Sequence, residues 1–443
     1  MIKLKKGLNL NLLGSATASK IDINCPSTCA IIPDDFNGVT PKLDVKEGDI
    51  IPAGTPLYHD KDIPDIKVTS PISGKVSQII RGERRKIESI VICEQEKMPP
   101  VSHDVSKVDA TSIKSVLLSS GLWAFMRQRP YDIVPNPLKA PRDIFVTAFD
   151  SAPLAPDFAL LLQGKENYLE KGVAVLSQLT TGKVYIGVPY TMPLAIKGAV
   201  ITAFDGPHPA GNVGVQIANI KPVNKGEVIW TLDAITLVRI GELFTTGIVP
   251  YTCEVAITGS EIVTPKYIKT TIGAPISALL DNNIKSSDNV QRIISGNVLT
   301  GYKVDKDSFL RFPYRQITVI PDLEHKDEFM GWASISPKKY SLSHSFTNWL
   351  FSRNKPNKFD ARINGGKRAI IMAGEYDKML PMDIYAEFLI KSIIAFDIDK
   401  MEQLGIYEIA PEDFALCEFA DTSKLELQQI VRDGLDKFRK EMN

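Results

Sequence analysis

Short runs of β-branched and aliphatic residues, separated by turn residues, fill the first hundred positions of the chain. Such runs flank Gly48 and Gly54, and Ser70–Gly74 forms a further turn before the next apolar run. Runs of this length between glycines and prolines predict short strands. Leu8–Leu12 alternates apolar and polar residues, which predicts a half-buried first strand. We therefore expect residues 1–100 to form an all-β barrel-sandwich hybrid.

A barrel-sandwich domain of the biotinyl/lipoyl type either carries a cofactor on a hairpin lysine or serves as a rigid docking module. Lys61 is the candidate carrier, because it lies near the hairpin that precedes Pro71. The intervening Pro64 has no N–H and a fixed φ, so it interrupts the ladder that a carrier hairpin requires. Asp60 and Asp62 flank the lysine, as in a solvated loop. The sequence favours a docking module over a lipoyl or biotinyl carrier.

From residue 143 onwards, continuous apolar runs alternate with helical patterns. Strands that are buried on both faces and alternate with helices predict a doubly wound, parallel sheet. We expect a Rossmann-like α/β domain over 101–252, which includes an extended loop at 127–143 that holds four prolines. The expected strands are Ile144–Phe149, Val184–Val188 and Ala199–Phe204, and the expected helices are Thr111–Met126, Gly164–Gln178 and Asp233–Phe244.

The remaining residues predict two smaller units. Residues 253–330 contain two strand patterns around a turn at 263–265 and a short helical pattern, for which a β-grasp, SLBB-like arrangement is expected. Residues 331–443 are mainly helical in pattern, with one helix after Pro381. Ser423–Glu426 is a capping box that opens a final amphipathic helix.

Charge and composition exclude several classes of protein. The 52 basic residues balance 52 acidic residues, which argues against nucleic acid as a partner. No apolar run approaches the length of about 18 residues that a membrane span requires. The basic N-terminus is followed by leucines, but Asn9 and Asn11 interrupt them, unlike in a secretory signal. Five cysteines, an odd number, do not resemble a disulfide framework, so we expect a cytoplasmic chain.

The strongest candidate for a binding site is the loop that follows the predicted strand Ala199–Phe204. Ligands of open α/β sheets bind at the carboxyl ends of the strands. The glycines of the loop have the spacing of a P-loop, but Asn212 and Val213 replace the lysine and the Ser/Thr that bind phosphate. A structural turn and a binding or docking loop are both compatible with the pattern. The candidate residues are Gly206, Pro207, His208, Pro209 and Gly211.

Other chemistry finds no support in the sequence. The histidines at 59, 103, 208, 325 and 344 show no metal-ligand spacing. Cys25 and Cys29 form a C-x3-C pair without a second pair, which favours a structural role over metal binding. No serine or cysteine lies in a nucleophile elbow. We expect no catalytic residue, no metal site and no cofactor of the chain's own.

Several motifs in order along the chain together resemble one family. They are M-I-K-L-K-K-G-L at the start, G-P-H-P-A-G-N-V-G from Gly206, I-S-G-N-V-L-T-G from Ile294, M-L-P-M-D-I from Met379 and P-E-D-F-A-L-C from Pro411. In this combination the chain resembles the A subunit of the sodium-translocating NADH:quinone reductase. The resemblance implies a peripheral subunit on the cytoplasmic face of the bacterial inner membrane. The implied complex oxidises NADH, reduces ubiquinone or another quinone and exports sodium.

The resemblance also implies cofactors and partners. The FAD, FMN, iron–sulfur and NADH sites of the complex belong to other subunits, and those subunits are the expected partners. Quinone binding by this chain is open in the family, and the loop with His208 is where we would place it. Histidine can donate a hydrogen bond to a quinone carbonyl or exchange a proton near neutral pH.

The family is related to the flavoprotein subunit of complex I and to the electron-input subunit of the Rnf complex. An Rnf-type module that binds flavin or NADH is therefore an alternative interpretation. A [4Fe–4S] cluster takes four closely spaced thiolates. After Cys417, however, Ala420 and Asp421 take the place of the second cysteine that family members often have. This departure argues against a redox or metal role for Cys417.

Overall fold

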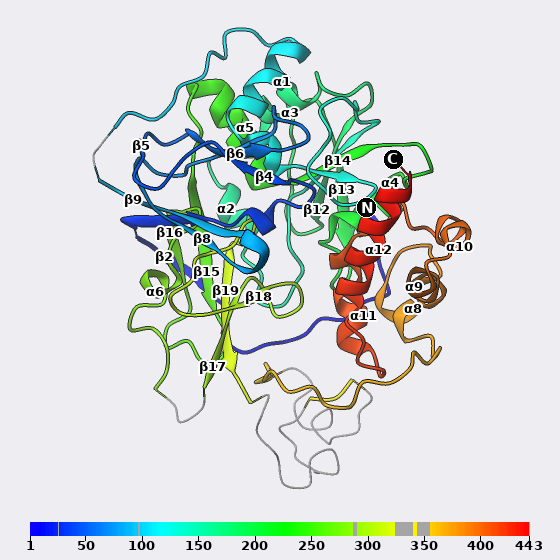
Figure 1. Cartoon of the computed structure of the whole chain (residues 1–443). Helices are drawn as coiled ribbons and strands as arrows, with labels where there is room; N and C mark the ends of the chain where they lie inside the picture. Colours follow the sequence, from blue (N-terminus) through cyan, green and yellow to red (C-terminus); the bar gives the residue numbers. More distant parts are fainter. Residues whose placement is uncertain (25, 96–97, 287–289, 324–339, 343–354, 443) are drawn as a thin grey trace.

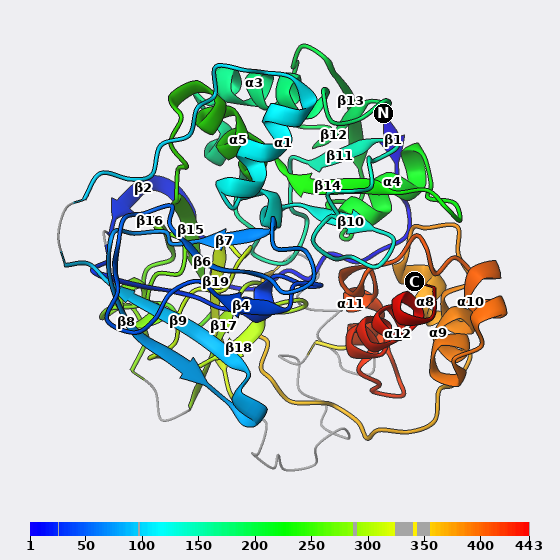
Figure 2. The same cartoon turned by 45° about the horizontal axis from the view of Figure 1, so that its top comes forward.

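The computed structural model describes residues 1–24, 26–95, 98–286, 290–323, 340–342 and 355–442. The strands of the described residues form four sheets. Three parts lie side by side: an α/β part, a β-rich part, and a group of helices from the end of the chain (Figures 1 and 2).

The α/β part is built on a six-stranded sheet in the order β1-β13-β12-β11-β14-β10. All neighbours are parallel except β10, which is antiparallel to β14. Its strands are β1 (Ile2–Lys3), β10 (Arg127–Arg129), β11 (Ile144–Thr147), β12 (Val184–Pro189), β13 (Ala199–Asp205) and β14 (Ile229–Asp233), and its helices are α1 (Ala110–Ser119), α2 (Phe158–Leu162), α3 (Glu166–Leu176), α4 (Val213–Ile220) and α5 (Ala234–Thr246), with a 3-10 helix at Leu122–Phe125.

Helices cover both faces of this sheet. Val146 belongs to the same core as the buried side chains of α3 and α5, whereas its neighbour Phe145 packs with Ile217 of α4. Successive residues of a strand point to opposite faces, so the two sets of helices lie on opposite sides. The predicted helix from Asp233 has clear ends, because Asp233 accepts a hydrogen bond from the N–H of Thr236 as N-cap. A left-handed glycine follows its last turn.

The β-rich part contains the other three sheets. One has the order β18-β17-β19-β15-β16-β2 and contains β2 (Thr17–Ile23), β15 (Thr252–Thr258), β16 (Lys266–Thr271), β17 (Gln291–Ser295), β18 (Tyr302–Val304) and β19 (Gln316–Pro321), with α6 (Ile276–Leu279) beside it. The others have the orders β3-β9-β8-β5 and β4-β6-β7; their strands are β3 (Thr28–Ile31), β4 (Pro41–Leu43), β5 (Ile50–Ile51), β6 (Pro56–Asp60), β7 (Lys67–Thr69), β8 (Gly74–Arg81) and β9 (Ile87–Cys93), with 3-10 helices at Pro33–Asp35 and Glu83–Arg85.

The C-terminal helices share a hydrophobic core with β13, α4 and the residues that follow β1. Leu4, Phe204 and Val215 are buried together with apolar side chains of these helices. Residues 331–339 and 343–354 of the predicted helical region lie outside the described residues, as do 324–330 of the predicted β-grasp unit. The helices are α8 (Glu375–Met379), α9 (Ala386–Ala395), α10 (Ile398–Gln403), α11 (Ala415–Ala420) and α12 (Leu427–Met442), with a 3-10 helix at Pro411–Phe414.

The predicted first strand at Leu8–Leu12 was wrong. Leu10 and Leu12 are buried and the asparagines beside them are exposed, so the alternation is real, but the segment forms no strand. Leu12 makes an isolated bridge with Asn357, and an extended segment that packs against other elements can alternate in burial without belonging to a ladder. The strands on either side of it, β1 and β2, pair with β13 and β16, outside the two sheets that carry residues 28–93.

The proline-rich segment 127–143 is also not wholly a loop, because its first three residues form β10. Strand β10 pairs with β14 and stops immediately before Pro130, which has no N–H to continue the ladder. The Rossmann-like and β-grasp descriptions and the four domain boundaries remain predictions.

Candidate functional site

The loop Gly206–Asn212 joins β13 to α4 at the carboxyl end of the parallel sheet, where we expected it. Thr147 ends β11 and donates a hydrogen bond from Oγ1 to the carbonyl oxygen of Gly211 at 3.0 Å. Its hydroxyl also accepts a hydrogen bond from Nε2 of Gln216 at 2.9 Å. The loop is therefore held against the sheet at its centre and through the helix that follows it.

His208 is the central side chain of the loop and is only 3% exposed. Its Nδ1 lies 3.0 Å from Oγ of Ser151, which also accepts a hydrogen bond from the N–H of Gly211 at 2.8 Å. If the Ser151 hydroxyl donates to Nδ1, then Nδ1, the hydroxyl and the N–H of Gly211 each have a hydrogen-bond partner. The proton of the neutral imidazole is then on Nε2. That Nε2 is buried and has no hydrogen-bond partner among the described residues.

The N-terminal segment covers this loop. The N–H of Leu8 donates to the carbonyl oxygen of His208 at 2.8 Å, and the N–H of His208 donates to Oδ1 of Asn9 at 2.9 Å. Gly7 has a φ of +119°, and a Cβ added there would lie 2.2 Å from the carbonyl oxygen of His208. Pro207 is half-buried and Gly206 is exposed, whereas the other three candidate residues are buried. The turn thus packs on residues 4–9.

Burial also sets the chemistry of the imidazole. It lowers the pKa of His208 to about 4, because the charged form would lose its hydration. Near neutral pH the ring is therefore uncharged. It can donate or accept a hydrogen bond, but it is not poised for the proton exchange near neutral pH that we considered from the sequence.

A buried ion pair supports the loop from the other side. Arg129 and Asp413 are both fully buried, and Nη1 of Arg129 lies 2.8 Å from Oδ2 of Asp413. Burial acts to lower the pKa of Arg129, but Asp413 and Glu412 act to raise it and prevail. Nδ2 of Asn212 donates to the backbone carbonyl of Glu412 at 3.1 Å. Residues 129 and 413, far apart in sequence, thus meet behind the start of α4.

Sequence reasoning identified the loop but missed the residues that hold it. Asn9 and Ser151 contact His208, and Arg129 and Asp413 form the pair behind α4. For Asn9, the available signal was a polar residue that breaks an apolar run. For the ion pair, local sequence offers no signal, because the two charges meet only in the folded chain.

The cysteine positions give no sign of a cluster in the described residues. Cys25 lies outside them, and Cys29 and Cys417 are buried thiols whose pKa is raised, chiefly by burial. Within the same residues, no group of three or more His, Cys, Asp or Glu side chains could hold a metal ion. None of the helices described there has both the length and the apolar character that a membrane span requires.

Comparison with known proteins identifies the family. Three family models match: the NqrA N-terminal barrel-sandwich hybrid domain at 2–95, the NqrA second alpha/beta domain at 108–249 and the NQRA C-terminal domain at 254–306. The A subunit of the Na(+)-translocating NADH-quinone reductase from Hahella chejuensis is 38% identical, and the match covers both chains fully. The chain belongs to this family. The corresponding subunits from Neisseria meningitidis serogroup B and Pasteurella multocida are 34% and 35% identical, again over the full length of both chains.

Membership of the NqrA family confirms the resemblance drawn from the motifs, and the two matching models confirm the barrel-sandwich and α/β domains. Among solved structures, an NAD+-reducing [NiFe]-hydrogenase in the air-oxidized state matches 48% of this chain and 47% of that chain. The TM-score is 0.33 and the sequence identity 13%, which is too low to support any conclusion.

Proposed function

We propose that this chain is a peripheral, cofactor-free subunit of a Na(+)-translocating NADH-quinone reductase, on the cytoplasmic face of the membrane. Its relatives carry the name of that complex and match it over their full length. In this proposal the chain has no catalytic residue of its own. It serves the assembly of the complex, while FAD, FMN, iron–sulfur and NADH chemistry take place on the partner subunits.

One observation carries the cofactor-free part of the proposal. The carboxyl end of a parallel sheet is where α/β folds hold nucleotides and flavins. In this chain, that edge is occupied by the chain itself, because Leu8 and Asn9 bind the backbone of His208 and Gly7 lies against it. A flavin in this place would have to displace these contacts. The arrangement favours a docking subunit over an Rnf-type flavin module.

The test is purification of a tagged chain, both alone and from membranes that contain the whole complex. The isolated chain should show no flavin or iron–sulfur absorbance in the visible range. The tagged chain should bring the other subunits with it from detergent-solubilised membranes in constant proportion. A flavin bound in a one-to-one ratio to the isolated chain would overturn the cofactor-free assignment. Absence of the other subunits would overturn the assembly role.

Quinone binding at the loop Gly206–Gly211 is a second candidate function. The buried Nε2 of His208 favours it, because this atom has no partner among the described residues and the neutral ring can donate a hydrogen bond to a carbonyl. Access requires that residues 4–9 move away from the loop, since they cover the ring.

The variant His208→Ala in the whole complex tests quinone binding at this loop. A raised KM for quinone, with unchanged NADH oxidation by an artificial acceptor, is the expected result. His103→Ala is the matched control, because His103 also has a buried Nε2 without a partner in the described structure but lies beside Ser119, away from the loop. Quinone kinetics equal to those of the wild type would leave the loop with a structural role.

A further inference from the structure

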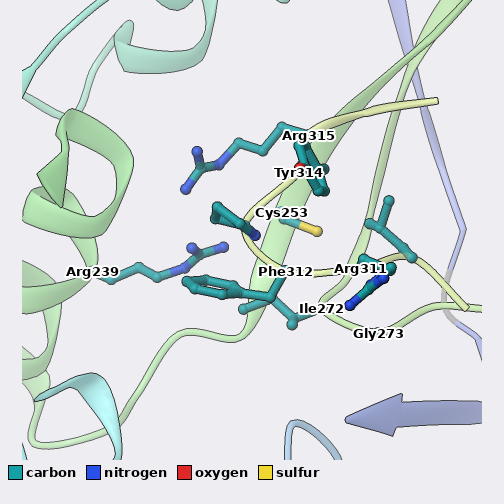
Figure 3. A pocket seen from close by; sticks show the side chains of 10 residues that line it. Arg239, Cys253, Ile272, Gly273, Arg311, Phe312, Tyr314 and Arg315 are labelled. Atoms are coloured by element: carbon teal, nitrogen blue, oxygen red, sulfur yellow. The ribbon is translucent and has the colours of Figure 1, made fainter. Parts of the chain in front are cut away.

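A small cavity that three arginines help to line lies where the α/β part and the β-rich part meet. It has a volume of about 10 Å³ and is lined by Arg239 of α5, Cys253 of β15 and the segment 310–315, among other residues. Figure 3 shows the side chains of Arg239 and Arg315 entering from different elements and ending on the same side of the cavity, with the Arg239 guanidinium beside Phe312. Phe312 stacks on Phe36 from the N-terminal region, with ring centroids 5.2 Å apart.

Two of the three arginines that line this cavity have carboxylate partners. Arg315 forms two hydrogen bonds with Asp233, at 2.6 and 3.1 Å. Arg311 lies 2.6 Å from Oδ1 of Asp35. These two pairs are internally neutral, so they leave the charge of the third arginine to be balanced by something else.

Arg239 is the third arginine and has no such partner. It is 3% exposed, and among the described residues no carboxylate lies within ion-pair distance of it. Its Nη2 donates one hydrogen bond to the carbonyl oxygen of Thr252 at 2.8 Å, and its guanidinium lies 5.9 Å from the ring centroid of Phe125. The Nε atoms of Arg239 and Arg315 are both buried without a partner in the described structure.

The charge on Arg239 persists at neutral pH. Burial and the neighbouring Arg315 lower its pKa to about 10, against the smaller opposing effects of Cys253, Asp233 and Glu254, so it stays protonated. Asp233 is already paired with Arg315, and Glu254 with Lys165. The Cys253 thiol cannot supply a compensating negative charge, since burial raises its pKa to about 11. An unpaired buried cation costs several kcal/mol, so a charge in this position needs a counter-ion.

We propose that the cavity binds one small monovalent anion of the halide class, held between the guanidinium groups of Arg239 and Arg315. Space of about 10 Å³ accommodates a single water-sized ligand, which favours a halide over the larger phosphate and carboxylate ions. The ion touches groups from α5 and from the segment before β19. It therefore stabilises the contact between the α/β part and the sheet that contains β15.

The first experiment measures thermal unfolding of the intact chain in the sodium salts of chloride, bromide and gluconate at equal ionic strength. Chloride and bromide should raise the Tm in a saturable way, because a ligand that binds only the folded state stabilises it. Arg239→Gln should lower halide affinity about tenfold or more, the loss expected for a charged hydrogen-bond donor. Arg292→Gln is the control and should keep the effect, since Arg292 pairs with Asp322 beyond the end of β19, whereas Arg315 precedes its start.

Crystals grown in bromide give a second readout that needs no variant. An anomalous peak within hydrogen-bond distance of both Arg239 and Arg315 is expected. A water molecule in that position, or equal Tm shifts in all three salts, would overturn the proposal. So would a halide effect of equal size in the Arg239→Gln and wild-type chains. If Arg239→Gln does not fold, the anomalous density decides.

Discussion

The backbone N–H of His208 donates a hydrogen bond of 2.9 Å to Oδ1 of Asn9, so that a residue near the N-terminus holds the loop after β13. His208 is buried, so its backbone N–H is shielded from water. Without the Asn9 side chain this N–H would have no hydrogen-bond acceptor. Much of the behaviour of this region follows from that contact, because the same N-terminal segment also covers the imidazole.

Replacement of Asn9 by alanine should lower the free energy of unfolding by about 1–2 kcal/mol, the cost of an unsatisfied buried donor. Asn11→Ala is the matched control and should change it by less than about 0.5 kcal/mol, since the Asn11 side chain is equally exposed but makes no hydrogen bond within the described residues. Urea denaturation of the two variants measures both values. Equal stabilities of the two variants would show that the bond from His208 contributes nothing.

Gly7→Ala should destabilise the chain more strongly than an ordinary substitution at a left-handed glycine. At Gly7 a Cβ would lie 2.2 Å from the carbonyl oxygen of His208, whereas Gly48, with a φ of +97°, has nothing within 4 Å of a Cβ. Gly48→Ala therefore measures the backbone strain alone, about 1 kcal/mol. A Tm loss for Gly7→Ala at least twice that for Gly48→Ala is expected. Similar losses would mean that the N-terminal segment moves away without cost.

The buried His208 makes stability depend on pH in a definite direction. The pKa of His208 is about 4 in the folded chain, against an ordinary value of 6.5. Between these two pH values the unfolded chain binds a proton that the folded chain does not. Stability is lost as pH falls from 6.5 towards 4, by about 3 kcal/mol over the whole window. Asp35 and Glu408, with pKa values raised to about 6 and about 7, give the opposite slope.

The quantity to measure is therefore the difference in the free energy of unfolding between the wild type and His208→Gln, obtained by urea unfolding at a series of pH values. This difference cancels the contribution of the carboxyl groups, which both chains share. The wild type should lose more stability than the variant between neutral pH and pH of about 5. Parallel pH profiles would contradict a neutral, buried imidazole.

The ion pair between Arg129 and Asp413 should be far more sensitive to mutation than an exposed pair. Asp413→Ala leaves a buried guanidinium with only one carboxylate contact, the longer one to Glu412 at 3.4 Å, and should cost about 3–5 kcal/mol. Glu426→Ala removes the partner of Lys367, where both side chains are 65% exposed, and should cost less than about 1 kcal/mol. Thermal or urea unfolding compares the two variants. Comparable losses would mean that the Arg129 site relaxes and takes up water.

Lys61 should be unmodified and dispensable. It is exposed in the connection between β6 and β7, and its backbone N–H donates to the carbonyl oxygen of Thr40. The intact mass of the purified chain should equal that of the sequence, and Lys61→Ala should leave assembly and NADH-driven quinone reduction near the wild-type values. A lipoyl or biotinyl increment in mass would restore the carrier interpretation.

Local pattern was sufficient to determine most of the elements. The apolar strands β11, β12 and β13 and the helix α5, with Asp233 as its N-cap, lie within a few residues of their predicted positions. Hydrophobic periodicity and capping act over one or two turns or one strand, so they can be read from neighbouring residues. The ordered motifs likewise determined the family without any structure.

Tertiary structure alone decided what each pattern packs against. The alternation of Leu8–Leu12 is compatible with a strand and with an extended segment that contacts a loop, and the choice depends on partners two hundred residues away. The pairing of Arg129 with Asp413 and the lack of a carboxylate partner for Arg239 in the described structure depend in the same way on contacts between distant segments. Burial, pKa and charge balance are properties of such contacts, and for that reason they became visible only in the folded chain.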